Sequence, residues 1–184
     1  MKNFLVGLFT VICLCFAAGS IVYASGAIDL DEISYNRSTD GTAVFYVRFM
    51  DDYFLLDKNG FVLGTSLNEP DDIPEIENLL FSNLTVGKTA KADDEDDLDY
   101  VMEVCSLLRE EDISVSEIYV EDGEITLYLA SDLSVMLGDD EDTDVKISDL
   151  KSLYSDLMEY SGVLYMQEAD TDGSGYTFKV SSGS

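Results

Sequence analysis

Residues 53–63 read Tyr53-Phe54-Leu55-Leu56-Asp57-Lys58-Asn59-Gly60-Phe61-Val62-Leu63, and this stretch decides the fold class. Two apolar runs flank Asn59-Gly60, and both of these turn residues tolerate the positive φ of a type I′ turn. The pattern predicts a β-hairpin, and Val44 to Phe49 predicts a further strand before it. The folded part of the chain is therefore expected to begin with strands, near Ala43.

Two later segments have the periodicity of amphipathic helices. The first runs from about Leu98 to Arg109 and the second from about Val145 to Tyr160, and Gly162 follows the second as a stop signal. Apolar residues three or four positions apart form the stripe of each helix: Leu98, Val101, Cys105 and Leu108 in the first, and Ile147, Leu150, Leu153, Tyr154, Leu157 and Met158 in the second. Each stripe is expected to pack on a sheet.

Short β-branched and aromatic runs predict the remaining strands: 117–120, 125–130, 134–137, 162–167 and 176–180. Residues 64–97 hold both prolines, Pro70 and Pro74, and are expected to be mostly irregular, with one helical turn at Glu75 to Phe81. The order of elements is ββ-α-βββ-α-ββ. It predicts an α+β domain with a largely antiparallel sheet.

The N-terminal part contains an apolar stretch of about 20 residues, from Phe4 to Tyr23, which is long enough to cross a membrane as a helix. We interpret residues 1–24 as a membrane anchor. A cleaved signal peptide stays open as the alternative, because Val22 and Ala24 suit the positions before a cleavage site. Both interpretations place the rest of the chain outside the cytoplasm. We expect residues 25–42 to be a linker or remnant strand, 43–180 to be the domain and 181–184 to be a tail.

Acidic side chains dominate the composition, with 38 Asp and Glu against 10 Lys and Arg, a net charge of -28 and no histidine. Nucleic-acid binding needs a cationic surface and is therefore excluded. The lack of histidine also excludes His-based catalytic triads and His-ligated metal sites. The apolar fraction of 46% is enough for a real core, so we expect a folded domain with a negative surface.

Acidic runs at 93–97 and 139–142 precede the predicted helices, where carboxylates interact favourably with the helix dipole. A calcium loop is considered at 170–175, because Asp170, Asp172 and Ser174 match the first ligand positions of an EF-hand. Ser181 stands where that loop needs a bidentate Glu, so a Gly-rich hairpin loop is preferred. We expect no metal and no cofactor.

Catalytic motifs are missing from the sequence, which has no nucleophile elbow, no Walker loop and no CxxC pair. Cys105 lies on the apolar stripe of its predicted helix, so we interpret it as a core residue and not as a nucleophile. We therefore expect no catalytic residues, and the protein is not expected to be an enzyme.

The stretch 53–63 resembles the strand, Asp, turn-Gly, strand element of the FtsQ/DivIB cell-division proteins. Ile118, the segment Val135-Met136-Leu137-Gly138, Lys146 and Gly162 match further pieces in the same order, so the resemblance covers about residues 43–180. It implies the β domain of a single-pass component of the bacterial divisome. The POTRA domain of such proteins is expected to be missing or reduced here.

The resemblance further implies a scaffold in the cell membrane at the division septum, which binds FtsL-like and FtsB/DivIC-like proteins by adding a strand to a sheet edge. The expected edge strand consists of Tyr176, Thr177, Phe178, Lys179 and Val180. Tyr176 and Phe178 share one face of it and either meet the partner or fill the core. The alternative function is a secreted or surface-exposed acidic protein that binds calcium or a small ligand.

Overall fold

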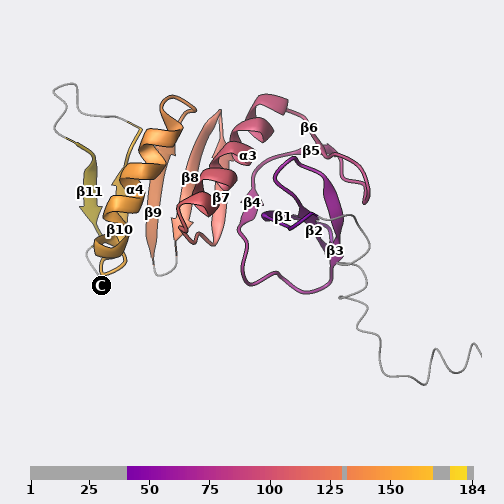
Figure 1. Ribbon diagram of the computed structural model, residues 1–184, viewed down its shortest axis with the longest axis horizontal. Helices are drawn as coiled ribbons and strands as arrows, with labels where there is room; N and C mark the ends of the chain where they lie inside the picture. Colours follow the sequence, from indigo (N-terminus) through magenta and orange to yellow (C-terminus); the bar gives the residue numbers. More distant parts are fainter. Residues whose placement is uncertain (1–40, 130–131, 168–174, 182–184) are drawn as a thin grey trace, which may run out of the picture.

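The computed structural model describes residues 41–129, 132–167 and 175–181 (Figure 1). Its strands are β1 (Phe45–Phe49), β2 (Asp52–Leu56), β3 (Val62–Ser66), β4 (Glu75–Glu77), β5 (Phe81–Asn83), β6 (Lys91–Ala92), β7 (Glu117–Glu121), β8 (Glu124–Leu129), β9 (Leu133–Gly138), β10 (Gly162–Tyr165) and β11 (Thr177–Val180). Its helices are α3 (Glu95–Glu110) and α4 (Thr143–Leu157). None of the helices in these ranges is long and apolar enough to span a membrane. The expected anchor at 1–24 lies outside the described residues.

Nine strands form one sheet in the order β11-β10-β9-β8-β7-β4-β1-β2-β3, and β5 pairs separately with β6. Most neighbours are antiparallel, but β1–β4, β4–β7 and β9–β10 are parallel. A parallel pair needs a crossover connection. The α3 segment supplies it between β4 and β7, and α4 supplies it between β9 and β10. The expected α+β class is thus confirmed, with a mixed sheet that is mostly antiparallel.

The helical turn expected at Glu75–Phe81 is wrong, because Glu75–Glu77 is strand β4 at the middle of the sheet. Both neighbouring strands bind its backbone: the amide of Tyr46 donates to the carbonyl of Pro74 (3.0 Å), and the amide of Glu75 donates to the carbonyl of Ser116 (3.0 Å). The strand has three residues and one inward apolar side chain, Ile76, so it is too short to show an alternating pattern in the sequence.

The predicted hairpin is confirmed, since β2 and β3 pair antiparallel across residues 57–61. Its turn is not type I′, because of the two central residues only Gly60 has a positive φ, at 70°. The Oδ1 of Asp57 accepts hydrogen bonds from the amides of Asn59 and Phe61, both at 2.9 Å. This side-chain turn favours a three-residue loop that ends in a left-handed glycine.

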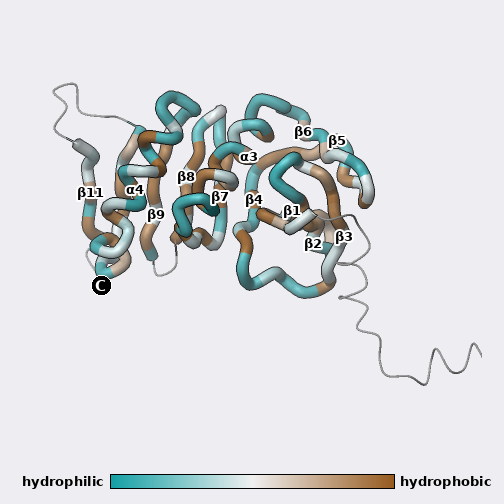
Figure 2. Tube along the Cα trace, viewed as in Figure 1, coloured by the Kyte–Doolittle hydropathy of each residue, from teal (hydrophilic) through white to brown (hydrophobic). Residues whose placement is uncertain are grey.

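Both helices pack on the same face of the sheet, where their buried residues join those of the strands in one core. Figure 2 shows hydrophobic residues along central strands such as β8 and β9, with hydrophilic residues in the loops. The two predicted stripes are confirmed except at Leu153, which is 37% exposed. A smaller cluster of Ala43, Tyr46, Leu55 and Leu63 fills the opposite face near β1–β3, together with Ile73.

Candidate partner-binding edge

The two edges of the large sheet differ in what covers them. At one edge, the start of β3 is occupied by residues 87–90. The amide of Val62 donates to the carbonyl of Lys88 (2.9 Å), the amide of Gly87 donates to the carbonyl of Val62 (2.9 Å), and the amide of Ala90 donates to the carbonyl of Gly60 (2.8 Å). The other edge is β11, and among the described residues no strand pairs with its outer side.

The pairing of β11 with β10 shows which of its backbone groups point outward. The strands are antiparallel, with Thr177 opposite Tyr165 and Lys179 opposite Val163. Two residues beyond Lys179, the amide of Ser181 donates to the carbonyl of Ser161 (2.9 Å). Because bonded pairs alternate in an antiparallel ladder, Thr177 and Lys179 direct their backbone groups toward β10. Phe178 and Val180 therefore direct their N–H and C=O groups toward the open side.

Gly162, the first residue of β10, allows this close pairing. A Cβ built there would collide with the carbonyl oxygen of Lys179 and would lie 2.9 Å from Cζ of Phe178. Only glycine leaves room for the backbone of β11 at this distance. Gly162 was expected as the stop signal after the second helix, and the structure shows that it also serves this pairing.

A groove of about 470 Å³ runs beside β11 on the helix-bearing face. Residues of α4, β10 and β11 and of the turns next to them line it, and its apolar members are Leu153, Leu157, Tyr160, Leu164, Tyr176 and Phe178. Tyr160 is 53% exposed, and its ring meets the Phe178 ring edge-on at 6.2 Å. The groove is thus an exposed apolar strip along an open strand.

Tyr176 and Phe178 are partly buried against the core, which confirms the core interpretation in part, and they also line the groove. Their contact with a partner stays a prediction. The hydroxyl of Tyr176 donates to Oδ2 of Asp149 on α4 at 2.9 Å. Burial, together with this carboxylate, raises the pKa of Tyr176 to about 12. Tyr176 is therefore a neutral donor that ties the start of β11 to α4.

On the other face of β11, Thr177 and Lys179 are exposed. The Lys179 ammonium lies 4.2 Å from the centroid of the Tyr165 ring on β10, within the range of a cation–π contact. Lysine is common on edge strands, where it discourages unspecific pairing between sheets. Strand β11 therefore combines backbone groups that no described strand pairs with and a side chain of the kind that discourages unspecific pairing.

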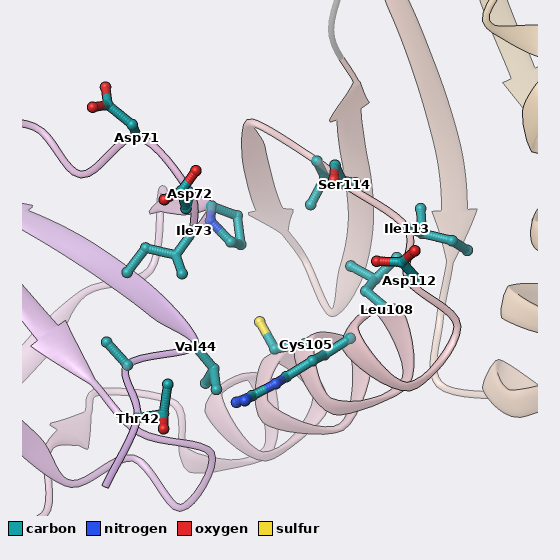
Figure 3. A pocket seen from close by; sticks show the side chains of 14 residues that line it. Thr42, Val44, Asp71, Asp72, Ile73, Cys105, Leu108, Asp112, Ile113 and Ser114 are labelled. Atoms are coloured by element: carbon teal, nitrogen blue, oxygen red, sulfur yellow. The ribbon is translucent and has the colours of Figure 1, made fainter.

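A second hollow, of about 410 Å³, lies between the start of β1, the loop before β4 and the C-terminal end of α3 (Figure 3). Asp71 and Asp72 come from that loop, and Asp112 comes from the turn after α3. Cys105 borders the hollow with a buried thiol, and burial raises the pKa of that thiol, which disfavours the reactive thiolate. The expectation that Cys105 belongs to the core is confirmed.

The acidic runs take the helix-terminal positions that the sequence predicts. Asp94 caps α3, and its Oδ1 accepts from the amides of Asp96 (3.0 Å) and Asp97 (3.4 Å). In the second run, Asp139 accepts from Nζ of Lys146 through its carbonyl at 3.0 Å and through Oδ1 at 3.4 Å. Within the described ranges, no three acidic or cysteine side chains are grouped to hold a metal. Asp170, Asp172 and Ser174 lie outside those ranges.

Sequence reasoning located β11 but missed the groove beside it. Tyr160 was counted as the last helical residue, whereas α4 ends at Leu157 and the following turn places Tyr160 against Phe178. The available signal was an aromatic residue two positions before the glycine that starts β10, but this signal does not indicate which distant residue the ring contacts.

Taken together, the described residues form an α+β domain in which two helices cover one face of a mixed sheet, with an apolar groove beside an edge strand. The model of the family "Cell division protein FtsQ/DivIB, C-terminal" matches residues 46–171, and the chain belongs to this family. The resemblance drawn from the sequence is confirmed. Membership assigns the chain to cell division, in a family of scaffolds and not of enzymes.

One solved structure similar to this chain is that of the major extracytoplasmic domain of the trans isomer of the cell-division protein DivIB from Geobacillus stearothermophilus. The two are 17% identical with a TM-score of 0.42, and the similarity covers 66% of this chain and 98% of that one. No curated protein matches.

Proposed function

We propose that this protein is a non-enzymatic division scaffold that binds its partners by strand addition at β11. The observation that supports this most is the outward direction of the backbone groups of Phe178 and Val180, derived from the β10–β11 register. A partner strand supplies the missing donors and acceptors, which gives affinity through the main chain. FtsL-like and FtsB/DivIC-like proteins are the proposed partners. The proposed location is the cell membrane at the septum, with residues 1–24 as a single anchor.

Side chains of an added strand alternate between the two faces of the sheet. Those on the helix-bearing face would enter the groove beside Leu153, Tyr160 and Phe178, so apolar residues are favoured there. Those on the other face would meet Thr177 and Lys179, so an acidic or polar residue is favoured. The partner segment is therefore expected to alternate apolar and polar residues.

The test is binding of the full-length chain to the organism's own FtsL-like and FtsB/DivIC-like proteins, by co-purification and then by titration. Val180→Pro removes an amide that points away from β10, so the variant keeps the β10–β11 pairing but blocks an incoming strand. We expect it to weaken binding at least about tenfold, which corresponds to about 1.4 kcal/mol. Val180→Ala keeps the amide and is the matched control, with an expected loss of less than about threefold.

Two results would contradict the proposal in different ways. Equal affinities of Val180→Pro and the wild type would exclude strand addition at β11 while leaving a scaffold role intact. Failure of the wild-type chain to bind either partner class would exclude the assigned partners. Far-UV circular dichroism of both variants shows whether the fold is kept.

A further inference from the structure

The face of the sheet opposite α3 and α4 is open from β4 to β10 in the ranges that the structure describes. The strand register arranges its outward side chains in two rows across the sheet. One row is Glu75, Glu117, Tyr128, Ser134 and Val163, and the other is Glu77, Tyr119, Thr126, Met136 and Tyr165. None of these side chains belongs to the buried core, whereas their neighbours along each strand do. We call this surface the open face.

The half of the open face on β8, β9 and β10 is mostly aromatic and apolar, with Thr126 and Ser134 as its small polar members. Tyr128 is 40% exposed, and Met136, Val163 and Tyr165 are partly exposed beside it. Tyrosine and methionine are enriched in the centres of protein interfaces. Three strands spaced about 4.8 Å apart span about 10 Å, which matches the 10–12 Å diameter of an α-helix. The strip therefore has the width on which one helix can lie.

The half of the open face on β4 and β7 is acidic apart from Tyr119. Glu75 and Glu117 are neighbours in adjacent strands, and Glu77 follows Glu75 on the same face. Burial and then the charges of Glu77 and Glu75 raise the pKa of Glu117. Burial also raises the pKa of Glu75, an effect that the hydroxyl of Tyr46 and, more weakly, Arg48 on β1 reduce. These carboxylates repel one another, so a cation placed over them would be favourable.

Charge also decides what can cover this surface. Two of the chain's own segments outside the described ranges are acidic, 25–40 with Asp29, Asp31, Glu32 and Asp40 against Arg37, and 168–174 with Glu168, Asp170 and Asp172. The segment 1–24 is apolar and is assigned to the membrane anchor under the proposed function. A second copy would bring the same glutamates onto these ones, and like charges in contact are unfavourable. An anionic lipid surface would be repelled in the same way.

We propose that the open face binds an amphipathic helix of a partner protein, with its apolar stripe on β8–β10 and a lysine- and arginine-bearing flank over β4 and β7. Helix on sheet is a stable way to bury an apolar sheet face. This site lies on the opposite face from the groove beside β11, so an added strand and a docked helix do not compete for the same side chains.

The experiment uses the full-length chain in detergent micelles and two labelled helical peptides, measured by fluorescence anisotropy. Both carry leucines at helical spacing; one has lysines along one flank and the other has glutamates there. We expect the lysine peptide to bind with micromolar affinity and the glutamate peptide not to bind. The triple variant Glu75→Gln, Glu77→Gln, Glu117→Gln is expected to lose at least about tenfold in affinity, and Tyr128→Ala several-fold.

The matched control changes three exposed glutamates away from the open face: Glu103→Gln, Glu110→Gln and Glu159→Gln. It removes the same charge and is expected to bind the lysine peptide within about twofold of the wild type. Equal losses of peptide affinity in the two triple variants would show that net charge alone determines binding, and this result would overturn the proposal. Analytical ultracentrifugation tests whether the chain dimerises. A dimer that Tyr128→Arg abolishes would assign the open face to a second copy and overturn the proposal. Val180→Pro should leave peptide binding unchanged, because the open face does not include the outer side of β11.

Discussion

At the scale of single residues, Gly162 has the clearest energetic role, because its missing side chain lets β11 lie close to β10. We expect Gly162→Ala to lower the free energy of unfolding by about 1–3 kcal/mol, the usual cost of overpacking. Urea denaturation measures this change. Hydrogen exchange should show faster exchange at Thr177, Lys179 and Ser181, whose amides face β10.

Gly87→Ala is the control for that substitution. Gly87 has a positive φ, at 81°, and nothing lies within 4 Å of a Cβ placed there. The control is therefore expected to cost about 1 kcal/mol from its backbone conformation alone, with no change in β11 exchange. Unchanged exchange in Gly162→Ala would contradict the role assigned to this glycine.

Residue roles that depend on neighbours along the chain could be predicted from the sequence, and roles that depend on distant atoms could not. Asp94 as a helix cap and Cys105 as a core residue follow from local spacing. Gly162 is required because the carbonyl of Lys179 lies close to it, and Lys179 belongs to another strand, β11. Asp57 shows the intermediate case, because its carboxylate competes locally with the expected Asn-Gly turn.

At the scale of elements, α3 depends on its first turn, where Asp94 accepts two amide hydrogen bonds and where Glu95, Asp96 and Asp97 follow. We expect Asp94→Ala to destabilise the domain by about 1 kcal/mol, because two amides lose their acceptor. Asp94→Asn keeps an acceptor and removes the same charge, so it should cost clearly less. Equal effects of the two substitutions in thermal or urea denaturation would mean that charge, and not capping, determines the contribution of Asp94.

Strand prediction succeeded where alternation extends over five or six residues, as in β7, β8 and β9. It failed at β4, which has three residues and takes its hydrogen bonds from two strands distant in sequence. The parallel pairings were missed for the same reason, since register between distant strands is a property of the whole sheet. Helices were located well because their stripes are local, although packing left Leu153 on the surface.

At the scale of the whole molecule, the candidate binding surfaces follow from sheet order. The sequence predicts a strand at 176–180, but only the order of the nine described strands places β11 at an end of the sheet. The backbone hydrogen bonds also show that 87–90 cover part of β3. Likewise, the high acidity was evident from composition, whereas the adjacency of Glu75 and Glu117 required the parallel β4–β7 pairing. The net charge could thus be predicted from the sequence, whereas the positions of the charged side chains on the surface could not.

That distribution determines how stability depends on pH. Burial is the main cause that raises the pKa values of Glu75, Glu117 and Asp97, and neighbouring carboxylates add to it. Because these pKa values are higher in the folded than in the unfolded chain, the folded state binds protons more readily. Their stabilising contribution is fully present below the unfolded pKa of about 4, and it is lost as the pH rises through the folded values. Repulsion within a chain of net charge -28 acts in the same direction.

We therefore expect the free energy of unfolding to be higher near about pH 5 than near about pH 7.5, measured by urea denaturation in about 0.15 M salt. Raising the salt at the higher pH should recover part of the difference, because salt screens repulsion between exposed carboxylates. The double variant Glu75→Gln, Glu117→Gln should be more stable than the wild type at the higher pH, by about 1 kcal/mol or less because both groups keep contact with solvent. It should also show a flatter pH dependence. A wild-type stability that decreases steadily from neutral pH to about pH 5 would show instead that favourable carboxylate contacts, such as the Asp94 cap, outweigh the repulsion on the open face.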